Sequence, residues 1–447
     1  MTNYCIVGAG SRGLSMFAED LVGHYQDVAR LTAIADINPG RVNHALQVLG
    51  SGVKGFTDFD EMLDTAPCDV VIVTTKDATH DEFIVKAMSR GKDVISEKPM
   101  TTDAAKCRSI LAAERETGRN LRVTFNYRYA PYKTEVKRLL QEGIVGDVQS
   151  VEFRWFLDTV HGADYFRRWH SQKKNSGGLL VHKATHHFDL INWWLDLEPQ
   201  EVVAMGARQY YLPSRMPGHG KRCSECHLTQ SCEFYLDLDA DPKLRALYRE
   251  NEHFDQYYRD GCVFSEDIDI EDTMSVLIRY PKNIQVTYGL TAATAFEGWQ
   301  VAFNGSLGRL EAFEPECFVA KTEARNFKER SRSSVRRAVD WRQATAEDAP
   351  DVQNLAVKFY PLFGGVKTFE VTHQSQGHGG GDRRLKDHLF RGVKEDPMGH
   401  AAGSRAGAMS ILVGVAANQS MAERRLVRIE DLLNEHSENK SIQEAGL

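Results

Sequence analysis

Residues 3–13 read Asn-Tyr-Cys-Ile-Val-Gly-Ala-Gly-Ser-Arg-Gly. The apolar first half is typical of a short buried strand, and the second half is a G-x-G-x-x-G motif. A helical pattern of apolar residues follows through 14–22, and the next apolar run, 31–35, stops at Asp36. An acid 23 positions after the last glycine, at the end of a second strand, is what a dinucleotide-binding βαβ unit requires.

Each part of the glycine motif has its own predicted task. Gly8 permits the tight turn, Gly10 lets a pyrophosphate approach the backbone, and Gly13 lets the helix pack closely on the strand. The helix N-terminus at Ser11 and Arg12 supplies free amides and a positive dipole to the phosphates. These residues are therefore predicted to bind the cofactor.

Asp36 indicates which dinucleotide is bound. Its carboxylate would accept hydrogen bonds from the adenine ribose and would repel a 2′-phosphate, so the sequence favours NAD over NADP. Arg41 lies near Asp36 in the chain and leaves NADP as an open alternative, because a guanidinium can bind a 2′-phosphate.

The strand–helix alternation continues through the first 125 residues. Strands are expected at 69–75, 93–96 and 121–125, with helices near 80–90 and 104–117. Short connections between alternating elements predict an α/β domain with a doubly wound parallel sheet, a Rossmann fold. The cofactor lies at the carboxyl ends of such strands, where Thr74, Thr75 and His80 follow the third strand; each could equally be an ordinary polar loop residue.

Glu97-Lys98-Pro99 follows the strand at 93–96. A lysine at the carboxyl end of a parallel strand is predicted to point toward the nicotinamide side of the crevice. Pro99 can form a tight turn through a cis bond, and Glu97 could hold the ammonium group in place.

With these motifs, the chain resembles the Gfo/Idh/MocA family of glucose–fructose oxidoreductases and inositol dehydrogenases. The family's G-x-G-x-x-G and E-K-P motifs are intact, and Asn126-Tyr127-Arg128-Tyr129 is similar to its N-x-R-Y-type segment. The stretch 177–189 resembles its G-G-x(3)-D-x(3)-H-x-x-D motif, with His186 and Asp189 in place and His182 where many relatives have aspartate.

The resemblance implies the organisation of the whole chain. An NAD-binding Rossmann domain, 1–125, would precede a substrate-binding and oligomerisation domain, 126–435, built on an open, mostly antiparallel sheet. That second domain would contain a cysteine-containing insertion near 205–265, and a polar tail would occupy 436–447. A homo-oligomer is expected by analogy with relatives.

Hydride transfer from an alcohol to a nicotinamide needs a base for the hydroxyl proton. His182, His186 and Asp189 are spaced i, i+4 and i+7, which would place them on one face of a helix. By analogy with the family, His186 is the candidate base, Lys98 orients and polarises the substrate oxygen, and His182 shares the proton relay. Lys183, Asp189, Tyr129 and Asn126 are the neighbouring candidates, Asn126 for the cofactor and the others for the substrate. Zinc binding by the histidines is the weaker alternative.

Two further segments suit a polyhydroxylated substrate. In the aromatic–basic cluster 165–170, Arg168 can hydrogen-bond hydroxyls or an acidic substituent, and Trp169 can pack on a sugar face. The glycine-rich loop 377–382 could fold over the pocket with His378 on the substrate. Solvated loops are the alternative for both segments.

Cysteines in the insertion follow a C-x2-C-x5-C pattern, with a fourth 30 residues later. Four thiolates could close a structural zinc site, and unliganded thiols are an equal alternative. The candidate ligands are Cys223, Cys226, Cys232 and Cys262.

Composition narrows the class of protein. The 447 residues are 42% apolar and 26% charged with a net charge of −7, which does not favour binding to nucleic acid or to an anionic membrane. No apolar run approaches a membrane span, and the first residues do not resemble a secretory signal. A cytoplasmic enzyme with reduced cysteines is expected.

Two functions therefore compete. The first is an NAD-dependent oxidoreductase that takes hydride from a secondary hydroxyl of a sugar, cyclitol or glycoside. The second is a redox-neutral NAD-dependent glycosidase, as in some members of the family, which oxidises the ring transiently, eliminates the aglycone and reduces again. The glycosidase needs a second base, for which His182, Lys183 or Tyr129 would serve.

Overall fold

The computed structural model describes residues 1–317, 354–372 and 377–434. The polar tail predicted at 436–447 lies outside this range. Within it, no helix combines the length and apolar character that crossing a membrane demands.

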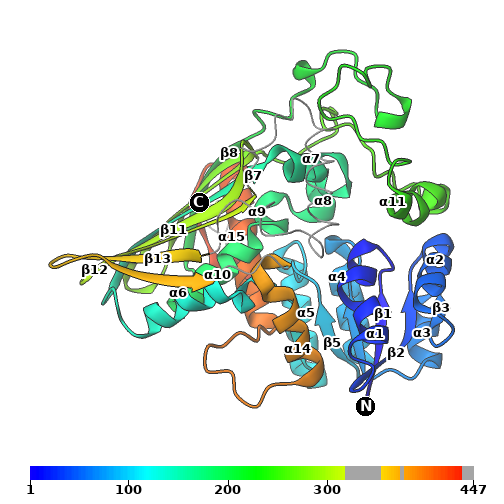
Figure 1. Ribbon diagram of the computed structural model, residues 1–447, viewed down its shortest axis with the longest axis horizontal. Helices are drawn as coiled ribbons and strands as arrows, with labels where there is room; N and C mark the ends of the chain where they lie inside the picture. Colours follow the sequence, from blue (N-terminus) through cyan, green and yellow to red (C-terminus); the bar gives the residue numbers. More distant parts are fainter. Residues whose placement is uncertain (318–353, 373–376, 435–447) are drawn as a thin grey trace, which may run out of the picture.

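The first domain contains a six-stranded, wholly parallel sheet, which confirms the predicted Rossmann fold (Figure 1). The strand order reverses beside the first strand, as in dinucleotide-binding folds, and opens a crevice at the carboxyl ends of the strands there. In order across the sheet, the strands are β3 (Lys54–Phe56), β2 (Ala29–Ala35), β1 (Thr2–Val7), β4 (Val70–Val73), β5 (Asp93–Ser96) and β6 (Leu121–Val123).

Helices of this domain begin and end at recognisable signals. Asn38 caps one helix by accepting a hydrogen bond from the Arg41 amide, and Asp103 does the same for another through Lys106. The helix after the glycine motif begins as a wide π-type turn, η1 (Gly13–Ala18), a form that is frequent at functional sites. The others are α1 (Glu19–Gly23), α2 (Pro39–Leu49), α3 (Phe59–Thr65), α4 (His80–Ser89) and α5 (Ala104–Thr117).

Among the described residues, the second domain contains a nine-stranded sheet in which β7 and β10 are parallel and all other neighbours are antiparallel. The predicted open, mostly antiparallel sheet is confirmed. Its strands, in order, are β14 (Lys367–Thr372), β13 (Asn354–Pro361), β12 (Gly308–Cys317), β11 (Glu297–Gly305), β7 (Val148–Asp158), β10 (Gln285–Thr294), β9 (Thr273–Arg279), β8 (Glu201–Ala207) and β15 (Val427–Arg428).

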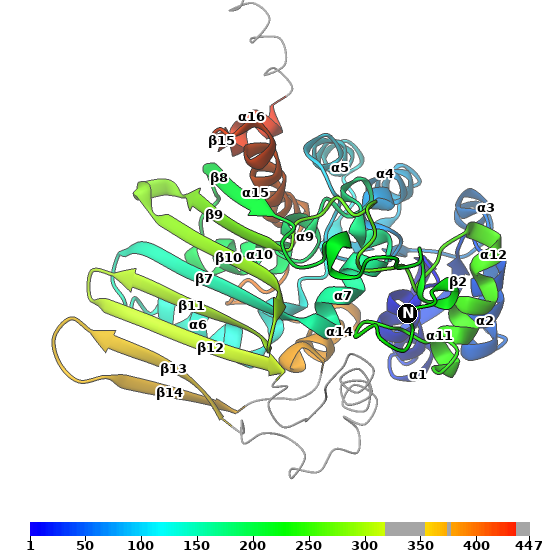
Figure 2. The same cartoon turned by 90° about the horizontal axis from the view of Figure 1, so that it is seen from above.

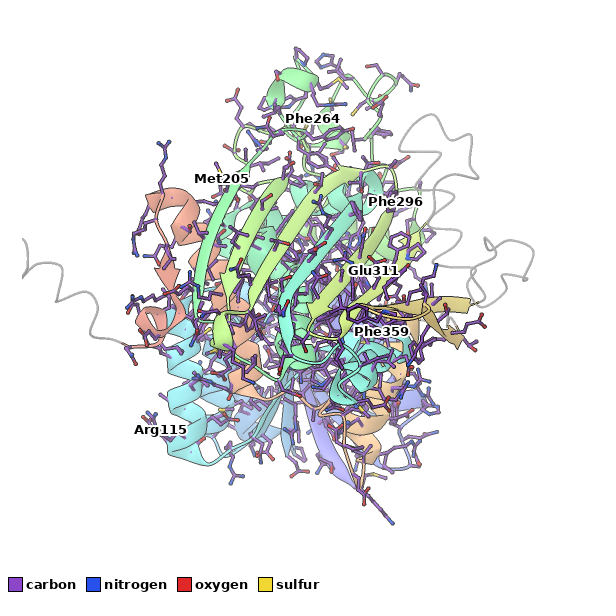
Figure 3. The ribbon with its side chains drawn as sticks, turned by 90° about the vertical axis from the view of Figure 1, so that its left-hand side faces the viewer. Arg115, Met205, Phe264, Phe296, Glu311 and Phe359 are labelled. Carbon is purple, nitrogen blue, oxygen red and sulfur yellow. The ribbon has the colours of Figure 1, made fainter. Side chains whose placement is uncertain are left out.

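One face of this sheet is open to solvent, and the other carries the core (Figure 3). Side chains alternate between the faces with the period of two that a strand imposes. Trp155, Trp299 and Tyr288 are fully buried on the inner face, whereas Met205 and Leu277 point outward and are 80% and 54% exposed. The outer face therefore offers apolar surface.

Helices on the inner face join the two domains (Figure 2). α15 (Ser404–Glu423) packs against β8 and α10 (Thr185–Leu195) on one side and against α5 and β6 on the other. The Val123 amide donates a hydrogen bond of 3.0 Å to the Ala402 carbonyl just before α15. The remaining helices near the domain boundary are α6 (Pro131–Gln141), α7 (Thr159–Arg167), α8 (Lys173–Ser176), α9 (Leu179–His182), α14 (Gly381–Arg391) and α16 (Ile429–Leu433).

A long insertion, 208–272, connects β8 to β9 and contains the short helices α11 (Pro242–Leu247) and α12 (Glu252–Asp255). Asp272 ties its ends together by accepting hydrogen bonds from the amides of Gln209, Tyr210 and Tyr211. The insertion reaches across to the Rossmann domain and lies beside α2 (Figures 1 and 2).

Candidate functional site

A cavity of about 710 Å³ lies where the Rossmann strands, the second domain and the insertion meet. One end is lined by the glycine motif and Asp36, and the other by Lys98 and a group of histidines. The predicted site residues that line it are Gly8, Gly10, Ser11, Arg12, Asp36, Thr74, Thr75, His80, Glu97, Lys98, Arg168, Trp169, His182, Lys183, His186 and His378.

The glycine motif lets backbone segments, and a bound pyrophosphate, come close to one another. Gly8 has a φ of +102°, and a Cβ there would lie 2.6 Å from the Thr74 carbonyl. A Cβ on Gly13 would lie 2.2 Å from the Gly8 oxygen, so both positions exclude a side chain. The nearest atom to a Cβ on Gly10 is the Tyr248 hydroxyl, at 3.5 Å, which leaves backbone accessible from the cavity. This is the cradle that a pyrophosphate needs.

Asp36 directly follows β2 and lines the same cavity as this cradle. Its Oδ2 accepts a 2.9 Å hydrogen bond from the Ala9 amide, and its Oδ1 lies 2.9 Å from Arg41 Nη2. Arg41 also pairs with Asp255 of the insertion. The charge of Arg41, which left NADP as an open alternative, is therefore balanced by the carboxylates of Asp36 and Asp255.

The predicted contact between Glu97 and the Lys98 ammonium is wrong. Glu97 Oε1 accepts a 2.9 Å hydrogen bond from Arg12 Nε, and its Oε2 accepts one from the Lys98 backbone amide. Lys98 Nζ instead donates to the His182 carbonyl at 3.4 Å. The Lys98–Pro99 peptide bond is cis, as the sequence suggested.

Polar residues after β4 brace the site. Thr74 Oγ1 donates a 2.8 Å hydrogen bond to the Gly8 carbonyl and so supports the glycine turn. His80 lies between two carbonyls, with Nδ1 2.8 Å from Pro99 and Nε2 3.1 Å from Thr75. Burial lowers the pKa of His80, which favours its neutral form between these loops.

The histidines do not share one continuous helix as predicted. α9 ends at His182 and α10 begins at Thr185, and the side chains diverge. His182 Nδ1 pairs with the Asp77 carboxylate, whereas the His186 ring stacks on Tyr127 with centroids 4.2 Å apart. Within the described residues, His186 Nδ1 is buried without a hydrogen-bond partner.

Asp77 is a site residue that the motif analysis missed. It is 3% exposed, lines the cavity and comes just after β4. Its position at the carboxyl end of a parallel strand was the signal that could have identified it. Because the pair is buried, the pKa of Asp77 is raised and that of His182 is lowered.

At this end of the cavity, burial is the largest cause of the shifted pKa values of Lys98 and His186. Burial and the charge of Lys183 lower the pKa of Lys98 to about 8. Burial, and then the charges of Lys98 and Lys183, lower the pKa of His186 well below its ordinary value. His186 is therefore neutral near pH 7 and can accept a proton, while Lys98 carries its charge below pH 8.

A second hydrogen-bonded chain borders the cavity. Tyr165 belongs to the predicted aromatic–basic cluster, but its partners His161 and Glu297 were missed. The Tyr165 hydroxyl lies 2.8 Å from His161 Nε2, and His161 Nδ1 lies 2.7 Å from Glu297 Oε1. Burial raises the pKa of Glu297, but the charge and hydrogen bond of His161 outweigh that effect and lower it overall. No sequence motif links these residues, because Glu297 lies in β11, 136 positions after His161.

The aromatic–basic cluster does face the cavity. Trp169 stacks on His170 with centroids 3.6 Å apart, and Arg168 Nη1 lies 2.8 Å from Asp164. Lys183 Nζ lies 4.8 Å from the centre of the Trp155 ring. These side chains present both a flat apolar surface and several hydrogen-bond donors.

Two substrate candidates and three cofactor candidates lie outside the cavity lining. Asp189 forms a buried ion pair with Arg128, with Oδ1 2.5 Å from Nη2, and the Tyr129 hydroxyl lies 3.0 Å from His388. Other side chains hold Asp189 and Tyr129 away from the cavity. Their positions therefore do not favour the predicted direct contact with substrate. The cofactor candidates that do not line the cavity are Gly13, Pro99 and Asn126. The side-chain nitrogen Nδ2 of Asn126 lies 3.0 Å from His378 Nδ1.

The insertion closes over the dinucleotide end. The Tyr248 hydroxyl accepts a 2.9 Å hydrogen bond from the Ser11 amide and donates to Ser11 Oγ at 3.1 Å. Asn38 donates to the Asn251 carbonyl at 2.8 Å. Motif analysis missed these insertion residues because their contacts depend on chain segments more than 200 positions away.

The four insertion cysteines do not form the predicted zinc site. Across the described ranges, no three His, Cys, Asp or Glu side chains lie in an arrangement that could hold a metal ion, and the four cysteines form no disulfide bond. Cys226 Sγ accepts hydrogen bonds from the amides of Gly220 and Leu228 instead. Arg222 holds this part of the insertion, with Nε 2.9 Å from Asp260.

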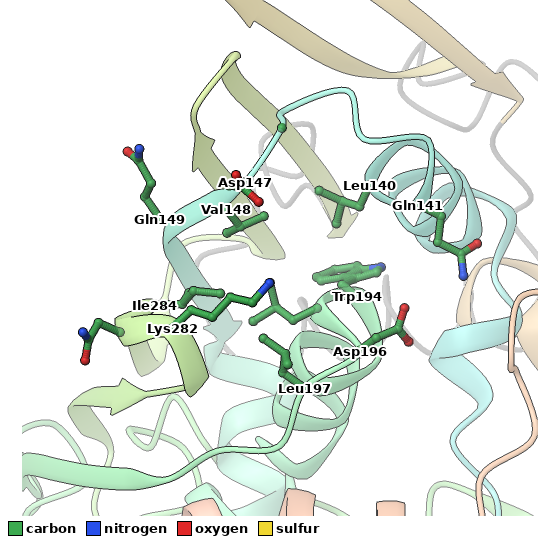
Figure 4. A pocket seen from close by; sticks show the side chains of 13 residues that line it. Leu140, Gln141, Asp147, Val148, Gln149, Trp194, Asp196, Leu197, Lys282 and Ile284 are labelled. Atoms are coloured by element: carbon green, nitrogen blue, oxygen red, sulfur yellow. The ribbon is translucent and has the colours of Figure 1, made fainter.

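A second cavity, of about 690 Å³, lies at the other end of the second domain (Figure 4). Trp194 and Leu140 border it, together with Lys282 from the turn between β9 and β10. It receives no residue from the Rossmann domain and so does not adjoin the dinucleotide cradle.

Comparisons with known proteins agree with this geometry. The YteT protein of Bacillus subtilis (strain 168) is 34% identical over 453 residues, covering 97% of this chain and 99% of that protein. The inositol 2-dehydrogenase of Rhizobium meliloti (strain 1021) is 29% identical over 202 residues, 45% of this chain and 57% of the enzyme. The crystal structure of an oxidoreductase domain protein from Kribbella flavida has the same fold, with a TM-score of 0.65 at 17% identity and coverage of 96% and 100%.

Family models match most of the chain. Residues 2–125 match the oxidoreductase family's NAD-binding Rossmann fold, and residues 137–429 match its C-terminal alpha/beta domain. With the dinucleotide cradle and Lys98 on one cavity, the chain belongs to the Gfo/Idh/MocA family of oxidoreductases.

Proposed function

We propose that the protein is an NAD-dependent dehydrogenase that takes hydride from a secondary hydroxyl of a sugar or cyclitol. The observation that carries this proposal is the placement of Lys98 and His186 on the same cavity as the glycine motif and Asp36. Hydride transfer requires the substrate hydroxyl, a base and the dinucleotide to meet, so the residues that bind each of them must line one cavity.

The residues at the dinucleotide end fit NAD. Ser11 and Gly10 would hold the pyrophosphate, and Asp36 would accept hydrogen bonds from the adenine ribose. When bound, NAD supplies the acceptor for the hydride. Asp36 and the neutralised Arg41 both favour NAD over NADP.

Three residues at the other end have roles in the proposal. The Lys98 ammonium hydrogen-bonds the reacting oxygen and stabilises the negative charge that develops on it. The neutral imidazole of His186 accepts the hydroxyl proton. The His182 ring pairs with Asp77 and the His182 carbonyl accepts a hydrogen bond from Lys98, so in this proposal the Asp77–His182 pair shares the proton relay.

The substrate class rests on the remaining lining. Trp169 offers an aromatic face, and Lys183 and the histidines offer donors for several hydroxyls. Relatives named as inositol dehydrogenases support a polyhydroxylated substrate. No comparison supports the glycosidase alternative.

The test follows NADH absorbance and aglycone release together, with purified protein, NAD and a panel of sugars, cyclitols and aryl glycosides. The proposal expects NADH to form in proportion to oxidised product. Aglycone release that requires NAD but yields no net NADH would replace it with the glycosidase. Absence of both signals across the panel, with NAD bound, would contradict a sugar or cyclitol dehydrogenase.

We also propose that the protein forms a homo-oligomer. The outer face of the second sheet, with Met205 and Leu277 exposed, is where a second copy would bury apolar surface. Analytical ultracentrifugation should show a mass above that of one chain, and a shift toward monomer in Met205→Glu. A monomeric wild-type protein at micromolar concentration would contradict this.

A further inference from the structure

Arg168 and Arg259 lie together on the cavity and share a single carboxylate. Arg168 follows α7, and Arg259 belongs to the insertion. Arg168 Nη1 lies 2.8 Å from Asp164 Oδ2, and Arg259 Nη2 lies 3.7 Å from the same oxygen. Arg167 adds further positive charge near Asp164, whose pKa the three guanidinium groups lower, so positive charge exceeds negative charge here.

Arg259 has unused hydrogen-bonding capacity. Its Nε and Nη1 are buried and have no hydrogen-bond partner among residues 1–317, 354–372 and 377–434. The rest of the group is held in place, because the guanidinium carbon lies 4.9 Å from the centre of the Tyr248 ring. A buried donor without an acceptor is unfavourable, because it has lost its hydrogen bonds to water. An oxygen-rich anion bound here would remove that cost.

The arginine pair lies between the two ends of the cavity. Arg259 packs on Tyr248, which contacts Ser11 at the dinucleotide end, and Trp169, next to Arg168, stacks on His170. Arg168, Lys98 and Arg259 all contribute positive charge at His170, whose pKa is lowered first by burial and then by these charges. His170 contacts His182, with ring centroids 4.3 Å apart. An anion bound by the arginines would therefore lie in the same cavity as Lys98 and His186.

We infer that Arg259 and Arg168 form a subsite for a carboxylate on the substrate, so that the preferred substrate is an acidic sugar such as a uronic acid. This inference rests on the proposed function, because it specifies which sugar that dehydrogenase takes. The pyrophosphate of the dinucleotide is the competing source of anionic oxygens.

The test measures binding separately from turnover. Protein saturated with NADH is titrated calorimetrically with glucuronate and glucose, and with galacturonate and galactose. At least one uronate should bind tenfold or more tightly than its neutral partner. In Arg259→Gln that preference should fall at least tenfold, while Arg259→Lys, which keeps the charge, should retain part of it. Arg245→Gln, an exposed arginine on the same insertion, is the matched control and should change nothing.

NADH titration of each variant separates the two anion sources. The inference expects Arg259→Gln to bind NADH as the wild type does, which also reports that the variant is folded. Weaker NADH binding with the sugar preference intact would assign Arg259 to the pyrophosphate and overturn the inference. Equal binding of uronates and neutral sugars by the wild type would overturn it too. Oxidation of neutral sugars alone would leave the proposed function standing, whereas oxidation of neither class would remove both.

Discussion

Arg41 of the Rossmann domain and Asp255 of the insertion form an ion pair at the adenine end of the cavity. Arg41 also contacts Asp36, and its side chain is only 9% exposed. The insertion therefore contacts the region that, in the proposed function, would distinguish NAD from NADP.

Asp255→Asn should weaken the preference for NADH over NADPH by about tenfold. Arg41 would lose one of its two carboxylates and could bind a 2′-phosphate, and tenfold corresponds to about 1.4 kcal/mol. Fluorescence titration with both reduced dinucleotides measures the ratio. Asp239→Asn, at an exposed position of the same insertion, should leave the ratio unchanged. If Asp255→Asn behaved like this control, Asp255 would have no part in selectivity.

Lys98→Met should abolish turnover with little loss of NAD binding. The ammonium group contacts the reacting oxygen in the proposed site, whereas the glycine motif and Asp36 hold the dinucleotide. Steady-state rates and NADH titration measure the two effects separately. Lys86→Met, a half-exposed lysine paired with Asp60, serves as the control. Normal turnover in Lys98→Met would remove Lys98 from the mechanism.

The rate of substrate oxidation should fall above about pH 8. Lys98 has a pKa of about 8, so it is charged and active below that value and neutral above it. His186 stays neutral through this range because its pKa is far lower. Lys183→Met should move the decline to higher pH, since it removes a charge that lowers the pKa of Lys98. A rate that rises through pH 8 would instead make neutral Lys98 the base.

Asp77→Asn should lower kcat about a hundredfold, a typical contribution of a proton-transfer group, with little change in KM. The substitution keeps the size of the side chain but removes the carboxylate that pairs with His182. A merely structural defect would instead reduce the midpoint of thermal unfolding and raise KM. Unchanged kcat would exclude the Asp77–His182 pair from proton transfer.

Asp189→Ala should destabilise the second domain by about 3–5 kcal/mol, because it leaves the Arg128 charge buried without its partner. Urea unfolding followed by tryptophan fluorescence measures the change. The folded variant should keep a near-normal KM, since Asp189 does not line the cavity. A large rise in KM at unchanged stability would restore the substrate role expected from the sequence.

Local signals allowed much of the Rossmann domain to be predicted. β5 (Asp93–Ser96) and α5 (Ala104–Thr117) have the expected bounds, because the strand is a compact apolar run and the Asp103 cap begins the helix. β3 and α3 were missed, since Lys54–Phe56 is short and half polar. The helix expected through 182–189 breaks at Lys183, where tertiary contacts of His182 and His186 outweigh the local pattern.

By itself, the sequence determined the family, the dinucleotide cradle, and Lys98 and His186 as site candidates, because short motifs encode close backbone packing and residue type within a few positions of one another. The tertiary structure alone decided which distant groups meet them. Asp77 reaches His182 across 105 residues, and Tyr248 reaches Ser11 across 237. Such pairs depend on how two sheets and an insertion pack together, and no local pattern of residues records that packing.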